Sequence, residues 1–224
     1  MEALTFDTAL AAMIDHTLLK PEAGESEVLR LCDEARMYGF ASVCVNPSWV
    51  RLCSDALYQH SSLVCTVIGF PLGNNCTEIK VREAELAMED GAHEFDMVLH
   101  VGHLKQGDLA YVENDISEVV AALKRVSDEN LVKVILETAL LTDDEITAAC
   151  GAAVRAGAEF VKTSTGFSKG GATVEAVRLM RSVVGEGIGV KASGGVRDRA
   201  SALAMIDAGA SRIGTSSSIA IVST

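Results

Sequence analysis

The segment "LVKVILETALLTDDEITAACGAAVRAGAEFVKTS" (residues 131–164) reads as one strand–helix–strand unit, and it decides the fold. Its two ends, residues 131–137 and 159–164, are short apolar runs rich in β-branched residues, which is typical of buried strands. Between them, Thr142 and Glu145 have the spacing of a capping box and predict the start of a helix. A strand, a helix and a second strand of this length form a βαβ unit.

The same unit repeats along the chain. Lys133, Lys162 and Lys191 occupy corresponding positions in three apolar runs and lie roughly 30 residues apart, the length of one βαβ unit. The remaining apolar runs lie at 13–19, 41–46, 63–70, 94–99, 188–193 and 211–216. Segments with helical spacing separate the runs, and several end on a glycine next to the following run: Gly39, Gly91, Gly157 and Gly209. Eight strands followed by helices predict a (β/α)8 TIM barrel, a single domain over residues 1–224, with a doubly wound open sheet as the alternative.

Composition and charge limit the functional classes. The 224 residues are 49% hydrophobic and 22% charged, with a formal net charge of −12, which describes a soluble globular protein. Lys and Arg together number 19 against 31 acidic residues, so the basic surface typical of nucleic-acid binding is missing. The six cysteines form no C-x-x-C pair, and no secretory signal is recognisable, which indicates a reduced, cytoplasmic protein. No apolar run approaches the roughly 20 residues that cross a membrane.

Polar side chains in the expected strands indicate chemistry inside the barrel. Strand alternation places Lys133, Lys162, Lys191 and Asp96 on faces that TIM barrels normally fill with Val, Ile and Leu. Two neighbouring ammonium groups disfavour each other, so one of Lys162 and Lys191 is expected to lose its proton near neutral pH. A neutral amine can attack an aldehyde and form a Schiff base, with Asp96 balancing the second lysine or relaying protons. A purely structural ion-pair cluster is the alternative.

Glycine-rich loops follow the last three expected strands. They are "SKGGAT" (168–173), "ASGG" (192–195) and "IGTSSS" (213–218). Backbone N–H groups in such turns bind phosphate without a positive surface, and phosphate sites after the last strands recur in this fold. The loops therefore predict a phosphorylated substrate, with Lys169 as an additional cation.

Seven segments together resemble the signature blocks of the 2-deoxyribose-5-phosphate aldolase family. In chain order they are "IDHTLLKP" (14–21), "SVCVNP" (42–47), "VIGFPLG" (67–73), "VKVILETALLTDDEI" (132–146), "FVKTSTGF" (160–167), "VKASGG" (190–195) and "RIGTSSS" (212–218). The resemblance implies a class I aldolase on a (β/α)8 barrel that cleaves 2-deoxy-D-ribose 5-phosphate to D-glyceraldehyde 3-phosphate and acetaldehyde. It implies no metal and no cofactor, and the partners are the sugar phosphate and the aldehydes. The sequence does not set the oligomeric state, and a homodimer is compatible with it.

The same resemblance implies roles for individual residues. Lys162 matches the Schiff-base lysine, Lys191 the lysine that perturbs it, and Asp96 the proton-relay carboxylate. The residues implied to bind the substrate are Asp15, Cys44, Lys133, Thr165 and Gly166. The residues implied to bind the phosphate are Gly170, Gly171, Gly194, Gly195, Gly214 and Ser216.

Two departures from the family and two other functions stay open at this point. Phe167 stands where some members carry a lysine, and His100 and His103 stand where an asparagine and a small residue are expected, so the pocket wall is expected to differ. A barrel that binds a sugar phosphate without turning it over also fits the glycine loops, although the pair of lysines argues against it. A phosphosugar isomerase would need a carboxylate or histidine base in place of the Schiff-base lysine.

Overall fold

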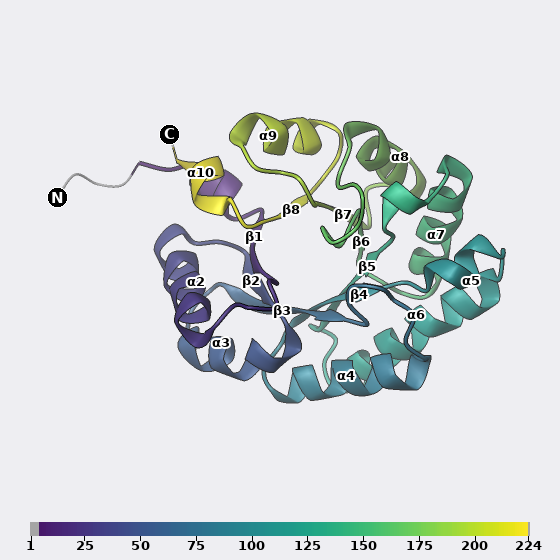
Figure 1. The fold of residues 1–224 in the computed structure, drawn as a ribbon, viewed down its shortest axis with the longest axis horizontal. Helices are drawn as coiled ribbons and strands as arrows, with labels where there is room; N and C mark the ends of the chain where they lie inside the picture. The colour runs from purple at the N-terminus through teal and green to yellow at the C-terminus, as the bar shows by residue number, and fades with distance from the viewer. Residues whose placement is uncertain (1–4, 224) are drawn as a thin grey trace.

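Eight parallel strands close into a barrel in which each strand pairs with the next along the chain and the last pairs with the first (Figure 1). The computed structural model describes residues 5–223. The strands are β1 (Ile14–Leu18), β2 (Ser42–Val45), β3 (Leu63–Ile68), β4 (Glu94–Val98), β5 (Leu131–Ile135), β6 (Phe160–Lys162), β7 (Gly189–Ser193) and β8 (Arg212–Thr215). Each lies within one of the apolar runs of the sequence. The (β/α)8 TIM barrel is therefore confirmed, and the open sheet is wrong.

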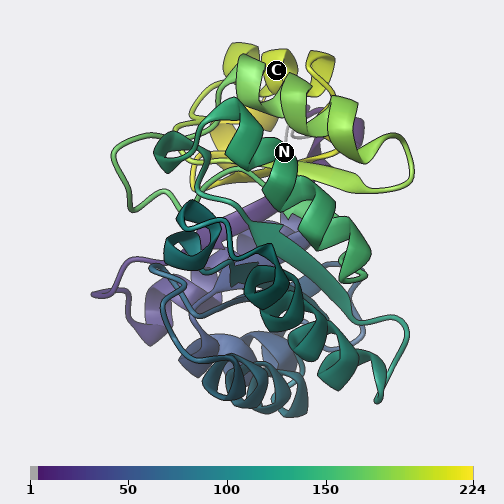
Figure 2. The same ribbon diagram turned by 90° about the vertical axis from the view of Figure 1, so that its right-hand side faces the viewer.

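Helices surround the barrel, as Figures 1 and 2 show from two directions. They are α1 (Thr8–Ala11), α2 (Glu25–Tyr38), α3 (Val50–Ala56), α4 (Thr77–Glu89), α5 (Val101–Lys105), α6 (Leu109–Lys124), α7 (Asp143–Arg155), α8 (Val174–Val184), α9 (Arg199–Asp207) and α10 (Ser218–Val222), with short 3₁₀ turns η1 (Pro47–Trp49) and η2 (Thr138–Leu140). The predicted capping box starts α7: the Thr142 hydroxyl accepts the N–H of Glu145, and the Glu145 carboxylate accepts the N–H of Thr142. Gly39 ends α2 with a φ of 67°, a conformation that favours glycine.

The main apolar core lies between the barrel wall and the helices. Strand residues such as Val43, Phe95 and Val134 are completely buried in this layer. Burial of an aliphatic or aromatic side chain of this size stabilises the fold by about 1.5–3 kcal/mol. Among the described residues, a second and much smaller apolar cluster lies apart from this layer: Leu19, Cys44, Cys65 and Val67. Because the outer layer supplies most of the hydrophobic stabilisation, the interior can hold charged groups.

The described part of the chain is held together without disulfides. All six cysteines are free thiols, and five of them are buried. The first and last described helices, α1 and α10, lie side by side (Figure 1), and Phe6 forms a bridge with Ser223. Asp7, just before α1, forms an ion pair of 2.6 Å with Arg199 at the start of α9. Within residues 5–223, no helix combines the length and the apolar character that a membrane span requires.

Candidate active site

Strand register brings four of the polar residues identified in the sequence together. Lys162 on β6 is the register partner of Lys191 on β7, and Asp96 on β4 is the partner of Lys133 on β5. Because alternate residues of a strand point to the same side, all four side chains enter the barrel interior. Lys162 is 3% exposed and the other three are completely buried. The strand alternation read from the sequence therefore placed these side chains correctly.

The Asp96 carboxylate is the centre of this cluster. Its Oδ2 accepts hydrogen bonds from Lys162 Nζ at 2.8 Å and from Lys191 Nζ at 2.6 Å. Its Oδ1 accepts a bond from Lys133 Nζ at 2.9 Å. Hydrogen bonds between ionised groups are roughly twice as strong as those between neutral groups. One carboxylate therefore fixes three amines that come from three different strands.

Two more acidic residues and one arginine complete the charge cluster. Lys191 Nζ lies 2.5 Å from Asp15 Oδ2, and Lys133 Nζ lies 2.6 Å from Glu94 Oε2. Arg212 contacts both of these carboxylates, at 2.6 Å from Asp15 and 3.2 Å from Glu94. Four basic side chains thus meet three carboxylates. Since buried charges need partners, the cluster is electrically balanced when one of its amines is neutral.

Lys162 has the fewest ion-pair partners of the three lysines. Within residues 5–223 its Nζ pairs only with Asp96, through an oxygen that it shares with Lys191. Lys191 also pairs with Asp15, and Lys133 also pairs with Glu94. Of the three lysines, Lys162 is therefore held by the fewest ion pairs, and its amine is the one least tied to the charge cluster.

Electrostatics keep the neighbours of Lys162 charged. Burial alone would lower the pKa of Lys191, but the charges of Asp15 and Asp96 outweigh it and raise that pKa above its ordinary value. The same competition raises the pKa of Lys133. Burial would raise the pKa of Asp96, yet the three neighbouring lysines, Lys133 foremost, lower it well below its usual range. At neutral pH, Lys191 is therefore an ammonium group and Asp96 a carboxylate.

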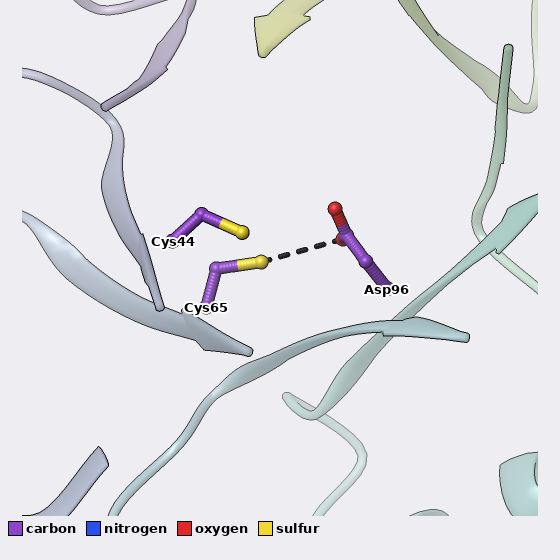
Figure 3. Close-up of side chains that lie close together, drawn as sticks. All are labelled: Cys44, Cys65 and Asp96. Carbon is purple, nitrogen blue, oxygen red and sulfur yellow. Dashed lines mark hydrogen bonds between the residues drawn. The ribbon is translucent and has the colours of Figure 1, made fainter. Parts of the chain in front are cut away.

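Two cysteines lie beside Asp96 in the barrel interior. Cys44 on β2 and Cys65 on β3 are register partners, and Figure 3 shows both side chains pointing toward Asp96. Cys65 Sγ lies 3.3 Å from Asp96 Oδ1 and 3.4 Å from Lys133 Nζ. The two sulfurs and the Asp96 carboxylate are close enough together to hold a metal ion. The Lys133 ammonium group already supplies positive charge to this carboxylate, which disfavours a divalent cation beside it.

A cavity of about 250 Å³ opens at the carboxyl ends of the strands, where TIM-barrel enzymes carry their active sites. Its lining residues are Thr17, Leu18, Leu19, Lys20, Lys162, Thr165, Gly166, Phe167, Ser193, Gly194, Gly195, Val196, Arg197, Gly214, Thr215 and Ser216. Of the four basic and three acidic side chains in the charge cluster, Lys162 is the one that lines this cavity among the described residues. A ligand in the cavity can therefore reach this amine, whereas its partners are covered.

Four of the glycines identified in the sequence lie on the cavity wall, together with Thr165 and Ser216. The glycines are Gly166, Gly194, Gly195 and Gly214. The first three have φ values of 84°, 84° and 82°, which favour glycine. Turns of this kind can direct backbone N–H groups toward an anion. This side of the cavity therefore has the backbone character expected of a phosphate site.

Gly170 and Gly171, later in the loop after β6, do not line the cavity. Gly171 packs tightly against Gly194: a Cβ added at Gly171 would lie 2.1 Å from the Gly194 carbonyl oxygen. Gly170 packs in the same way against Ala139, at 2.8 Å. Lys169 is exposed and also lies outside the cavity lining. These residues can shape the neighbouring wall, but they are not on it.

Three of the residues implied to bind the substrate also lie away from the wall. Asp15, Cys44 and Lys133 are completely buried among the charged groups of the barrel interior and are not among the cavity-lining residues. Their contacts run to Lys191, Asp96 and Cys65.

The sequence reading missed four charged residues of the site. Lys20 and Arg197 line the cavity, and Glu94 and Arg212 belong to the charge cluster. Lys20 and Arg197 lie just beyond the ends of β1 and β7. Because the loops after barrel strands form the active face, their positions in the sequence could have identified them as candidate site residues. Glu94 and Arg212 are the first residues of β4 and β8; Glu94 reaches Lys133 and Arg212 reaches Asp15.

The departures from the family pattern have different outcomes. Phe167 lines the cavity and packs edge-on against Phe70, with ring centroids 5.3 Å apart, so the wall is apolar there. His100 and His103 are not in the lining; His103 stacks on Tyr111 at 3.7 Å between ring centroids. Tyr111 also borders a surface cavity of about 690 Å³ between α4 and α6, to which the charge cluster contributes no residue.

Comparison with known proteins agrees with this geometry. The family model described as DeoC/LacD family aldolase matches residues 9–223. Deoxyribose-phosphate aldolase 1 of Bacillus licheniformis is 59% identical over 213 residues, which cover 95% of this chain and 94% of the relative. The deoxyribose-phosphate aldolase of Listeria welshimeri is 57% identical over 214 residues, covering 96% and 95%. The tetrameric deoxyribose phosphate aldolase of Aeropyrum pernix has a TM-score of 0.89 at 38% identity, covering 96% of this chain and 89% of that one.

Proposed function

This chain belongs to the DeoC/LacD family of aldolases, and we propose that it reversibly cleaves 2-deoxy-D-ribose 5-phosphate to D-glyceraldehyde 3-phosphate and acetaldehyde through a Schiff base on Lys162. The whole chain, residues 1–224, serves as a single catalytic domain. Relatives that carry this activity in their names match it over nearly their full length.

One observation supports the assignment of Lys162 above all others. Its amine borders the cavity at the active face, while its single ion-pair partner among the described residues is an Asp96 oxygen that Lys191 also uses. The cluster holds four basic groups and three carboxylates, so its charges balance when one amine is neutral. A neutral amine next to a ligand cavity is what attack on an aldehyde requires.

The first half of the reaction builds the Schiff base. Lys162 Nζ attacks C1 of the open-chain sugar phosphate and forms a carbinolamine, whose hydroxyl then leaves as water to give an iminium. Lys191 carries a proton at neutral pH and donates to the same Asp96 oxygen as Lys162. Lys191 is therefore placed to deliver the proton that leaves with the hydroxyl.

The second half breaks the carbon–carbon bond. When the C3 hydroxyl loses its proton, the C2–C3 bond breaks, C3 becomes the aldehyde of glyceraldehyde 3-phosphate, and the iminium accepts the electron pair as an enamine. Asp96 and a water relay the proton; because the pKa of Asp96 is low, the carboxylate does not retain it. Protonation of the enamine at C2 and hydrolysis release acetaldehyde and restore the Lys162 amine.

The phosphate of the substrate occupies the glycine side of the cavity. Gly194, Gly195 and Gly214 supply backbone close to the ligand, and Lys20 and Arg197 supply positive charge. This arrangement explains how a chain with a net charge of −12 can bind an anion, since dipoles and two local cations act at short range.

The proposal includes a homodimer and a cytoplasmic location. Six free thiols suit a reducing compartment. Sedimentation of the purified protein measures its oligomeric state. A tetramer, the form named for the Aeropyrum pernix relative, would contradict the dimer.

Trapping with borohydride tests the function. Reduction in the presence of acetaldehyde should add a two-carbon group to Lys162, located by peptide mapping, and the untreated enzyme should release glyceraldehyde 3-phosphate from the sugar phosphate. Label on Lys191 alone would contradict the assignment of Lys162. Tight binding of the sugar phosphate without label or turnover would identify a non-catalytic binding barrel instead.

A further inference from the structure

Glu137 holds a strained backbone conformation at the mouth of the barrel. Its φ of 60° and ψ of 58° lie in the left-handed region, two residues beyond the end of β5. Within residues 5–223, the only other non-glycine residue with a positive φ is Gln59, which is exposed on the surface. Glu137 is 4% exposed. A glycine would relieve the strain, so a glutamate here indicates that its side chain has a task.

The Glu137 carboxylate is buried with only part of its hydrogen-bonding capacity used. Oε2 accepts hydrogen bonds from the backbone N–H of Thr165 at 3.3 Å and, at shorter range, from the Thr165 hydroxyl. Oε1 has no hydrogen-bond partner among residues 5–223. A buried, half-satisfied carboxylate is costly, and such costs persist mainly at functional sites.

Thr165 transmits this contact to the wall of the substrate cavity. The Thr165 hydroxyl donates its proton to Glu137, and its oxygen accepts a hydrogen bond from the N–H of Phe167 at 3.1 Å. Gly166, between them, has a φ of 84°. Thr165, Gly166 and Phe167 all line the cavity that contains Lys162. One carboxylate therefore fixes three consecutive residues of that wall.

The same turn separates the substrate cavity from a second one. A cavity of about 310 Å³ lies on the other side of the turn, with Leu72, Leu140 and Glu137 in its lining. Thr165 and Phe167 line both cavities. Without the bonds to Glu137, the turn has space to move into the second cavity, and the substrate cavity would lose its shape on this side.

We propose that Glu137 is a positioning residue that holds the Thr165–Phe167 turn as the partition between the two cavities, and so sets the affinity for the sugar phosphate. This role rests on the proposed function, because it concerns the same substrate. Glu137 touches neither Lys162 nor the charge cluster in the described contacts, so the chemistry of the amine does not depend on it directly.

The test compares two ligands of different size on Glu137→Ala. KM for the sugar phosphate should rise about tenfold or more, since misplacement of a positioning group costs one to two orders of magnitude. Borohydride trapping of acetaldehyde on Lys162 should remain at the wild-type level, because a two-carbon ligand does not need the partition. Equal losses in trapping and in KM, or an unchanged KM, would overturn the proposal.

Three further variants make the test specific. Thr165→Val removes the hydroxyl and should raise KM like Glu137→Ala, and the double variant should be no worse than either single one. Thr165→Ser retains the hydroxyl and should restore most of the affinity. Gln59→Ala changes the other left-handed residue and should leave KM and trapping unaltered. Additive losses in the double variant would overturn the coupling, whereas a wild-type enzyme that traps no acetaldehyde would overturn the proposed function itself.

Discussion

Lys162 and Lys191 donate to one oxygen, Oδ2 of Asp96, at 2.8 and 2.6 Å. They are register partners on adjacent parallel strands, so the barrel itself sets their separation. Lys191 has a second carboxylate partner in Asp15, and this contact is absent for Lys162 among the described ion pairs. The two lysines therefore differ in the number of carboxylates beside them, and we propose that this difference separates the nucleophile from the proton donor.

Replacing Lys191 should impair catalysis in a pH-dependent way. Lys191→Met removes one positive charge, so three basic groups face three carboxylates and the cluster is balanced without a neutral amine. Turnover at pH 7 should fall about 10²–10⁴-fold, the usual contribution of a general acid. Part of the lost turnover should return toward pH 9, because a basic medium favours free amines over ammonium groups.

The matched control for that experiment is Lys162→Met. It lacks the nucleophile, so its activity should be absent at every pH. The measurement is the pH–rate profile of both variants, with circular dichroism to verify folding. A folded Lys191→Met protein with the wild-type profile would remove Lys191 from the mechanism.

The charge cluster should make stability fall in acid. The pKa values of Asp15 and Asp96 are lowered in the fold, because nearby basic groups outweigh the burial that alone would raise them. A depressed pKa contributes stability above the unfolded value, about 3.9, and that contribution is lost as the pH falls toward the folded value. The melting temperature should therefore drop steeply below about pH 4.

Asp15→Asn should flatten that acid dependence, because one carboxylate with a lowered pKa is gone. It should also lower the melting temperature at pH 7, where a buried Lys191 loses one of its partners. The exposed Asp33→Asn is the control and should leave the pH dependence as it is in the wild type. Identical melting curves for Asp15→Asn and the wild type from pH 3 to 7 would contradict the role of this cluster in stability.

A methyl group at Gly214 should disturb Lys191. A Cβ there would lie 2.8 Å from Lys191 Cε and 3.1 Å from Ser193 Cβ. Because Lys191 is completely buried, its side chain has little room to yield, and such overpacking costs about 1–3 kcal/mol. Gly214→Ala should lower both kcat/KM and the melting temperature. Gly187→Ala, which meets nothing within 4 Å, should change neither, and equal behaviour of the two variants would show that Gly214 is not needed for close packing.

Lys20 and Arg197 should contribute to binding of the substrate's phosphate group and little to binding of its sugar. Lys20→Met or Arg197→Met should raise KM for 2-deoxyribose 5-phosphate by about tenfold, since hydrogen bonds to charged groups contribute about 1.5–3 kcal/mol. KM for unphosphorylated deoxyribose should hardly change. Lys169→Met is the control, because Lys169 lies outside the cavity lining. Equal effects of all three variants on the phosphorylated sugar would show that only the overall charge counts.

The sequence alone determined the barrel and its reactive interior. The recurring unit of apolar run, amphipathic segment and glycine predicted all eight strands, because these patterns are local and the alternation of a strand has a fixed period. The same alternation placed Lys133, Lys162, Lys191 and Asp96 inside. The glycine loops indicated the correct face of the barrel, since that face follows from strand direction alone.

Only the tertiary structure decided how the charges are shared. Strands β1, β4 and β8 are distant in sequence, and the closed barrel brings Asp15, Glu94 and Arg212 to one place. No local pattern in the sequence indicates that these residues meet, which is why Glu94 and Arg212 were missed. Glu137 went unnoticed for the same reason: its left-handed backbone and its bonds to Thr165 depend on how two loops pack at the barrel mouth, and packing is a property of the folded chain.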